Sequence, residues 1–165
     1  MTFLPQDYTV PTSTSNYFKF EQGDNKFRVL SSAVIGWEGW IEKSPKRFRM
    51  DEKPTDLREF KDQKLNHFWA FIVWNYKAEK LQILQITQKG IMKTMQAHVA
   101  DEDWGDPKQY DIVVNREGED LTTKYEVKMK PKKELDKDIV QKYEEATIDL
   151  EKLFDGESPF PEETT

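Results

Sequence analysis

The amino-acid sequence predicts a mainly β fold: a five-stranded barrel with one helix between its third and fourth strands, a C-terminal helix and an acidic tail. Short stretches with the alternation, or the β-branched and aromatic content, of strands recur between residues 26 and 129. A helical periodicity over residues 88–99 interrupts them. The length of 165 residues suits one domain with a tail.

The first strand is predicted over residues 26–35, after an irregular arm rich in Thr, Ser and Pro. Gly36 and Gly39 follow it, and glycine in a strand pattern predicts a bend or bulge of the kind that closes a barrel. Residues 40–49 continue as a short strand or ribbon, and a charged loop leads to the next strand.

The strongest strand signal covers residues 67–76, and a short turn joins it to a strand over residues 80–86. A helix over residues 88–99 follows, because apolar residues recur there at every fourth position. Strands over residues 110–116 and 121–129 complete the set. A five-stranded barrel with its helix after the third strand has this order, which is the OB arrangement.

The chain beyond the barrel is expected to differ in character. Residues 1–133 are predicted to form the OB-like domain with its arm, residues 134–154 a helix with one apolar stripe, and residues 155–165 a disordered acidic tail. Residues 134–165 carry 11 acidic and 3 basic side chains, whereas the rest carries 20 acidic and 22 basic ones. The net charge of −6 is therefore a property of the C-terminus and does not argue against a polyanionic partner of the body.

The strand over residues 67–76 is apolar on both faces, which leaves two alternatives. One face can be offered to a ligand, since exposed aromatic rings on strands two and three of an OB fold stack on unpaired bases. Alternatively, the strand is buried on both sides beneath the C-terminal helix. The pattern alone does not choose between them.

Residues 37–49 interleave aromatic rings with cations, in the series Trp-Glu-Gly-Trp-Ile-Glu-Lys-Ser-Pro-Lys-Arg-Phe-Arg. Cations along a groove follow phosphates while rings between them take the bases, so this pattern favours binding of single-stranded nucleic acid. Lysines on the last strand extend the basic surface, although they would also protect an exposed edge. The candidate DNA-binding residues are Arg28, Trp37, Trp40, Lys43, Lys46, Arg47, Phe48, Arg49, Trp69, Phe71, Trp74, Tyr76, Lys124 and Lys128.

Catalytic and metal chemistry find little support in the sequence. The chain has no cysteine, two isolated histidines, and no P-loop, nucleophile motif or dinucleotide fingerprint. The acidic loop over residues 101–106 lacks the Glu that an EF-hand needs at its twelfth position, where Ile112 stands. We therefore expect a solvated loop pinned by Trp104, no cofactor, no metal and no enzyme activity.

Several blocks together resemble bacteriophage-encoded single-stranded DNA-binding proteins. They are Ser15-Asn-Tyr-Phe-Lys-Phe, Gly23-Asp-Asn-Lys-Phe-Arg-Val-Leu-Ser-Ser, His67-Phe-Trp-Ala-Phe-Ile-Val-Trp-Asn-Tyr, Leu81-Gln-Ile-Leu-Gln-Ile-Thr-Gln-Lys and Asp101-Glu-Asp-Trp-Gly-Asp-Pro. The resemblance implies an OB fold, a role in phage DNA replication, recombination or repair without sequence preference, and binding roles for Arg28 and the rings around Trp37 and Trp69.

The sequence thus predicts a sequence-tolerant single-stranded DNA-binding protein in the cytoplasm of a bacterial host. Replication or recombination proteins are expected partners through the acidic tail, no membrane is expected, and a homodimer is left open. The alternatives are a phage module that docks a host protein and a metal-dependent nuclease. The absence of a signal-like or membrane-spanning apolar run leads to the cytoplasmic expectation.

Overall fold

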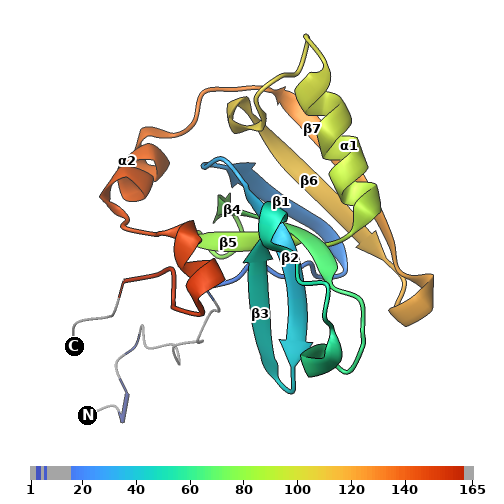
Figure 1. Ribbon diagram of the computed structural model, residues 1–165. Coiled ribbons are helices and arrows are strands. Elements are labelled where there is room, and N and C mark those ends of the chain that lie inside the picture. The colour runs from blue at the N-terminus through green and yellow to red at the C-terminus, as the bar shows by residue number, and fades with distance from the viewer. Residues whose placement is uncertain (1–2, 5, 7–15, 162–165) are drawn as a thin grey trace.

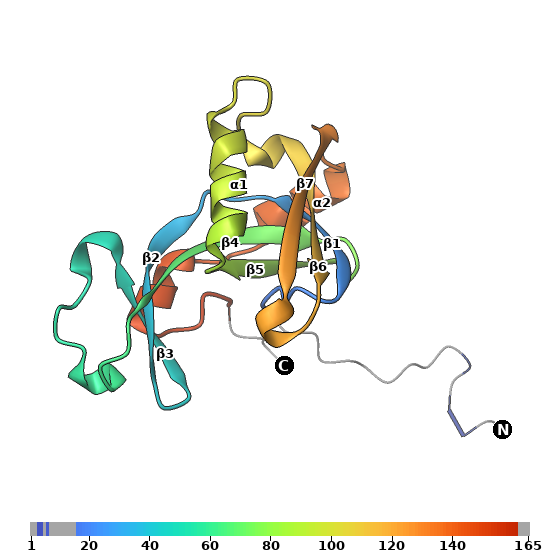
Figure 2. The same cartoon turned by 90° about the vertical axis from the view of Figure 1, so that its right-hand side faces the viewer.

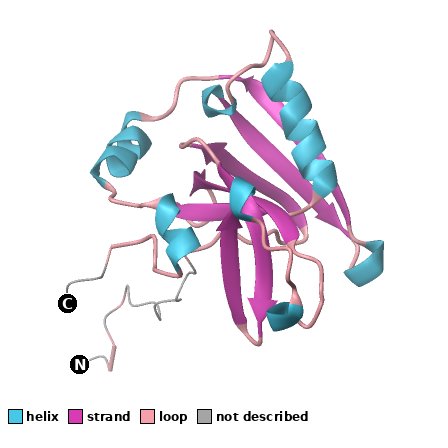
Figure 3. Cartoon of the chain, in the orientation of Figure 1, coloured by secondary structure: helices cyan, strands magenta, loops and turns pink. Residues whose placement is uncertain are grey.

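The computed structural model describes residues 3–4, 6 and 16–161, and within them the fold is mainly β, as predicted (Figures 1 and 3). A seven-stranded antiparallel sheet has the order β3-β2-β4-β1-β6-β7, with β5 on the other edge of β4. The strands are β1 (Gly23–Val29), β2 (Val34–Ile41), β3 (Ser44–Arg49), β4 (Asn66–Asn75), β5 (Lys80–Ile86), β6 (Tyr110–Glu117) and β7 (Lys124–Lys132). The helices α1 (Lys89–Ala100) and α2 (Lys137–Glu145) lie on opposite sides of β4, and single 3₁₀ turns connect other elements.

Strand β4 is the centre of the sheet, because it pairs on one edge with β1 and β2 and on the other with β5. Both of its faces are buried. Phe71 and Val73 join the α1 core, the cluster between the sheet and α1, while Phe68, Ile72 and Trp74 join the C-terminal core, the cluster between the sheet and residues 135–160. Most of β4 is therefore buried on both faces, which is the second of the two alternatives that the sequence left open.

The long first strand is divided in two. It was predicted over residues 26–35, whereas the structure breaks it at residues 30–33 between β1 and β2, which both pair with β4. The break is held by hydrogen bonds: Leu30 N donates to Ile72 O at 2.8 Å and Ile72 N donates to Ser31 Oγ at 2.8 Å. The predicted ribbon over residues 40–49 is the β2–β3 hairpin, in which Pro45 lies on an edge strand that needs no further amide donor.

The prediction of a closed barrel is wrong for the described residues. Closure requires the third and last strands of the barrel to pair, but β5 and β7 do not. Residues 16–20 take the free edge of β5 instead, because Phe18 N donates to Ile83 O at 2.8 Å and Ile83 N to Asn16 O at 2.9 Å. The Phe20 ring then packs on Tyr125 of β7, so this segment bridges the gap between the two strands.

Helix α1 confirms the predicted helix within one residue at each end. Ile91 and Met95 are buried in the α1 core, whereas Val99, the next residue of the predicted stripe, is 49% exposed. Strand β7 begins at Lys124 rather than at residue 121, since Leu121 lies fully exposed in the 3₁₀ turn before it.

The C-terminal segment differs most from its prediction. In place of one helix over residues 134–154, α2 ends at Glu145 and a 3₁₀ helix spans Leu150–Asp155. Three residues of the predicted apolar stripe, Ile139, Leu150 and Leu153, are buried in the C-terminal core. The other two, Tyr143 and Ala146, are only partly buried. Residues 155–161, expected to be disordered, continue along this core, where Pro159 O accepts a hydrogen bond from Asp149 N at 2.8 Å. The tail beyond residue 161 lies outside the described residues.

Gly36 and Gly39 serve close packing, and β2 shows no register shift at either position. A Cβ atom on Gly36 would lie 2.2 Å from Phe48 O and 2.9 Å from the Phe154 ring, so no side chain fits between the hairpin and the C-terminal segment. One on Gly39 would lie 2.4 Å from a methyl group of Leu65.

We predict that Gly36→Ala lowers the free energy of unfolding by about 2 kcal/mol or more, because the clash involves backbone as well as a ring. Gly90→Ala in α1 is the matched control: nothing lies within 4 Å of its Cβ position, so the change should be neutral or mildly stabilising. Urea unfolding followed by tryptophan fluorescence measures both. Equal stability of the two variants would contradict the packing role of Gly36.

Candidate nucleic-acid interface

Figure 2 shows α1 beside the strands β2 and β4. The side chains of these elements line a groove. It consists of two hollows, of about 460 and 620 Å³, which share Ala33 and Trp69. We call it the α1 groove. Its floor is apolar, formed by Ala33, Ile35, Trp69, Phe71, Met92, Met95 and Val99.

The floor of the α1 groove is open to solvent at both ends. Ile35 is 45% exposed and Val99 49% exposed, and they are among the few large apolar side chains that the described part of the chain leaves so open. Trp69 lies between the two hollows, half-buried, with Ile35 directly opposite it in the β2–β4 register. Exposed apolar groups that gather in a hollow mark a binding surface more often than scattered ones.

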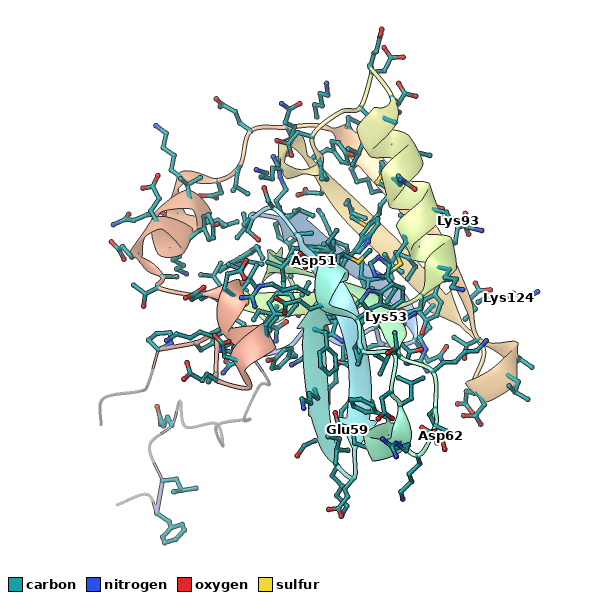
Figure 4. All side chains as sticks on the ribbon, viewed as in Figure 1. Asp51, Lys53, Glu59, Asp62, Lys93 and Lys124 are labelled. Atoms are coloured by element: carbon teal, nitrogen blue, oxygen red, sulfur yellow. The ribbon has the colours of Figure 1, made fainter. Side chains whose placement is uncertain are left out.

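Lysines stand along the rim of this groove. Lys89 and Lys93 project from the first turns of α1, and Lys108 follows from the 3₁₀ turn before β6. Near the β2 end, Lys53 lies over the Trp37 ring with its Nζ 3.9 Å from the ring centroid. Figure 4 shows Lys93 reaching outward from α1. Within the described residues, Asp106 is the one carboxylate that lines the groove, and it stands 3.9 Å from Lys108.

The predicted rings of β4 separate into accessible and buried ones. Trp69 lines the α1 groove and is half-buried. Phe71 also lines the groove but is only 2% exposed, and Trp74 is 6% exposed. Trp74 is covered further by Lys142 of α2, whose Nζ stands 5.1 Å from its ring centroid. Tyr76 donates its hydroxyl to Asp111 Oδ1 at 2.6 Å, and burial together with this carboxylate raises the pKa of the phenol. Phe71, Trp74 and Tyr76 are therefore structural in this state, and only Trp69 is placed to meet a ligand.

The interleaved block over residues 37–49 does not form one continuous surface. Strand alternation places Trp37 and Phe48 on the α1-groove side of the hairpin, and Trp40, Arg47 and Arg49 on the other side. The rings and cations are continuous in the sequence, but neighbouring residues of a strand point to opposite faces of the sheet.

The cations of that block are mostly neutralised by carboxylates. Arg47 lies 3.1 Å from buried Glu38, Lys46 lies 3.3 Å from Glu59, and Arg49 lies 3.1 Å from Glu151. Lys43, at the hairpin turn, is exposed, and Trp40 is 50% exposed near it. Phe48 packs on Phe60 beneath the loop that follows β3.

Arg28, implicated by the resemblance, is 2% exposed and has internal partners. Its guanidinium donates to Asp111 Oδ1 at 3.2 Å, to Lys108 O at 3.0 Å and to Lys133 O. It thereby ties β1 to the turn before β6 and to the end of β7. This geometry supports a structural role for Arg28 and not direct contact with DNA.

Lys124 and Lys128 lie exposed on β7, away from the α1 groove, and Figure 4 shows Lys124 at the outer end of that strand. Their role in binding stays a prediction. Sequence reasoning did not identify Ile35, Lys53, Lys89, Lys93, Val99 or Lys108 as candidate binding residues. The spacing of Lys89 and Lys93, four residues apart on one helix face, was the available signal. The others come together only through folding.

The acidic loop over residues 101–106 is held in place by Trp104, as the sequence predicts. Trp104 packs edge-on against His98 and Tyr110, with 5.4 Å between ring centroids in each case. Asp101 and Asp106 accept hydrogen bonds from nearby backbone amides. No group of three or more potential metal ligands gathers in the described part of the chain.

Comparisons with protein-family models, with curated proteins and with solved structures give no match to this chain. Among the residues that the structure describes, no helix has the length and apolar character needed to cross a bilayer.

We predict that Arg28→Ala lowers the free energy of unfolding by about 3 kcal/mol, because it removes the buried cation of Asp111 and leaves only the half-exposed Lys26, whose Nζ stands 3.8 Å from Asp111 Oδ2. Arg58→Ala is the control: its pair with Asp56 is shorter, at 2.7 Å, but exposed, so solvent screens it and little stability should be lost. Urea unfolding compares the two. A stable Arg28→Ala protein that fails only in DNA binding would contradict the structural role.

Proposed function

We propose that this chain binds single-stranded DNA in the α1 groove, with little preference for sequence. One observation carries the proposal: an apolar groove, open at Ile35 and Val99 with half-buried Trp69 between them, lies between lysines on separate elements. Bases stack on aromatic and apolar groups, and the cations along the groove meet the phosphates. A floor with few hydrogen-bonding groups cannot distinguish base edges, which is the reason for sequence tolerance.

The strand pairing supports an OB-like arrangement as part of this proposal. The divided first strand pairs with β4 and β6, β4 pairs with β5, α1 follows β5, and β6 pairs with β7. The OB fold is a Greek-key barrel that is only partly closed, so the gap between β5 and β7 is compatible with it. The resemblance in the sequence adds the inference that the strands bound are exposed during phage DNA replication, recombination or repair.

The site that we propose is not the one usual for OB folds. In those folds the outer face of strands two and three binds oligonucleotides. Here the corresponding face of β4 and β5 contributes Phe68, Ile72, Trp74 and Ile83 to the C-terminal core, beneath α2 and the segment after it. We therefore place the DNA on the opposite side of β4, where Trp69 is accessible.

Salt dependence tests the proposal. Four lysines on four phosphates predict a slope of about −3 for log K against log salt concentration, or about a 50-fold loss of affinity between about 50 and 200 mM salt. Lys93→Glu should weaken binding and reduce the slope by about 1, whereas Lys152→Glu, exposed on the C-terminal segment, should change neither. Fluorescence anisotropy of a labelled oligothymidylate gives both values.

Absence of binding at low salt would rule out the proposal and favour a module that docks a protein. Cleavage of the strand with Mg²⁺ would instead indicate a nuclease.

The two tryptophans of β4 provide a second test. Trp69→Leu keeps an apolar group on the α1 core and removes the ring, so affinity should fall by about 10-fold with the fold preserved. Trp74→Leu opens a cavity in the C-terminal core and should cost about 2 kcal/mol of stability with little direct effect on DNA. Oligothymidylate titrations and urea unfolding separate these effects. If Trp74→Leu weakened DNA binding and Trp69→Leu did not, the DNA would bind the other face of β4.

A further inference from the structure

His67 stands at the β2 end of the α1 groove, in the same hollow as Ile35, Trp69, Lys89 and Lys93. The imidazole is half-buried beside Trp37, with 5.1 Å between ring centroids. Trp37 is itself held in place, because its Nε1 donates to Met50 O at 3.3 Å and Lys53 covers its ring. The histidine is thus fixed at a point where the groove is lined by cations.

The hydrogen bond of His67 determines which ring nitrogen can titrate. Its Nδ1 lies 2.8 Å from Gly36 O, and a carbonyl oxygen only accepts, so Nδ1 carries a proton in either charge state. Among the described residues, none forms a hydrogen bond with Nε2. Nε2 is therefore the atom that gains a proton when the ring becomes a cation.

Three cationic side chains lie near His67 at this end of the groove. Lys89 and Lys93 come from α1, and Lys53 from the turn after β3. That turn also carries Asp51 and Glu52, and Glu52 lies 3.9 Å from Arg49 on the other side of the hairpin. Of the described residues, no carboxylate lines the hollow of His67. A phosphate that enters this hollow places a negative charge beside the imidazole and stabilises the imidazolium.

We propose that His67 binds a backbone phosphate of the single strand through protonated Nε2, so that DNA binding takes up a proton and is tighter at acid pH. This rests on the proposed function and assigns one phosphate contact to a titrating residue. The direction follows from charge: the cationic form, populated at lower pH, is the one that the phosphate favours. Binding and proton uptake then depend on each other by linkage.

The chain is well suited to a test, because it has two histidines and no cysteine. His67→Asn keeps a side-chain N–H that can reach Gly36 O and removes the titrating nitrogen. His98→Asn is the matched control, since His98 also holds its Nδ1 on a carbonyl, 2.9 Å from Thr94 O, but packs on Trp104 and lines neither hollow. Oligothymidylate affinity at about pH 6 and about pH 8 and constant ionic strength gives the pH dependence. Calorimetry at neutral pH in two buffers of different ionisation enthalpy counts the protons taken up.

We expect wild-type protein and His98→Asn to bind about five-fold more tightly at the lower pH, with net proton uptake. His67→Asn should show a flat profile and no uptake, while its thermal unfolding remains cooperative. Wild-type binding that is independent of pH, or a His67→Asn protein that retains the full dependence, would overturn the role of His67 and leave the DNA proposal standing. Absence of DNA binding at either pH would overturn the proposed function as well.

Discussion

The burial of β4 on both faces is the constraint on which the rest of this structure depends. A strand with apolar side chains on both sides needs a cover on each, and the chain supplies α1 on one side and residues 135–160 on the other. Its two edges are also fully used, by β1 and β2 together and by β5. The remaining strands join the sheet through these neighbours, β3 through β2, and β6 and β7 through β1.

The two covers differ in completeness, and that difference creates the candidate site. On the C-terminal side, apolar groups from α2, the 3₁₀ helix and the segment ending near Phe160 close over Phe68, Ile72 and Trp74. On the other side, α1 covers Phe71 and Val73 but leaves Trp69 partly open next to Ile35. The α1 groove is therefore the part of a hydrophobic core that its helix does not reach, with lysines of the helix and of two loops along its rim.

Charge pairing explains why a basic sequence segment is not automatically a basic surface. Arg47 and Arg49 are neutralised by Glu38 and Glu151, the latter from the acidic C-terminal segment. That segment thus acts on the hairpin as an internal partner as well as a hydrophobic cover. Arg28 shows the same principle in the interior, where Asp111 and two carbonyl groups take its donors. Lys89 and Lys93 are two exposed cations of the groove for which no such ion pair forms within the described residues.

The sequence by itself determined the mainly β class, β5 and α1 almost to the residue, and the apolar stripe of the C-terminus, because these follow from local periodicity. It could not decide which face of β4 stays open, since both faces read as apolar and only the packing of α1 and α2 distinguishes them. The sequence also did not predict that residues 16–20 pair with the edge of β5 that a closed barrel needs. Which segment pairs with a free strand edge depends on which one the tertiary fold brings next to it. The groove is likewise a product of the tertiary structure: Ile35, Trp69, Lys93 and Lys108 come from four separate parts of the chain, and no spacing in the sequence shows that they line one groove.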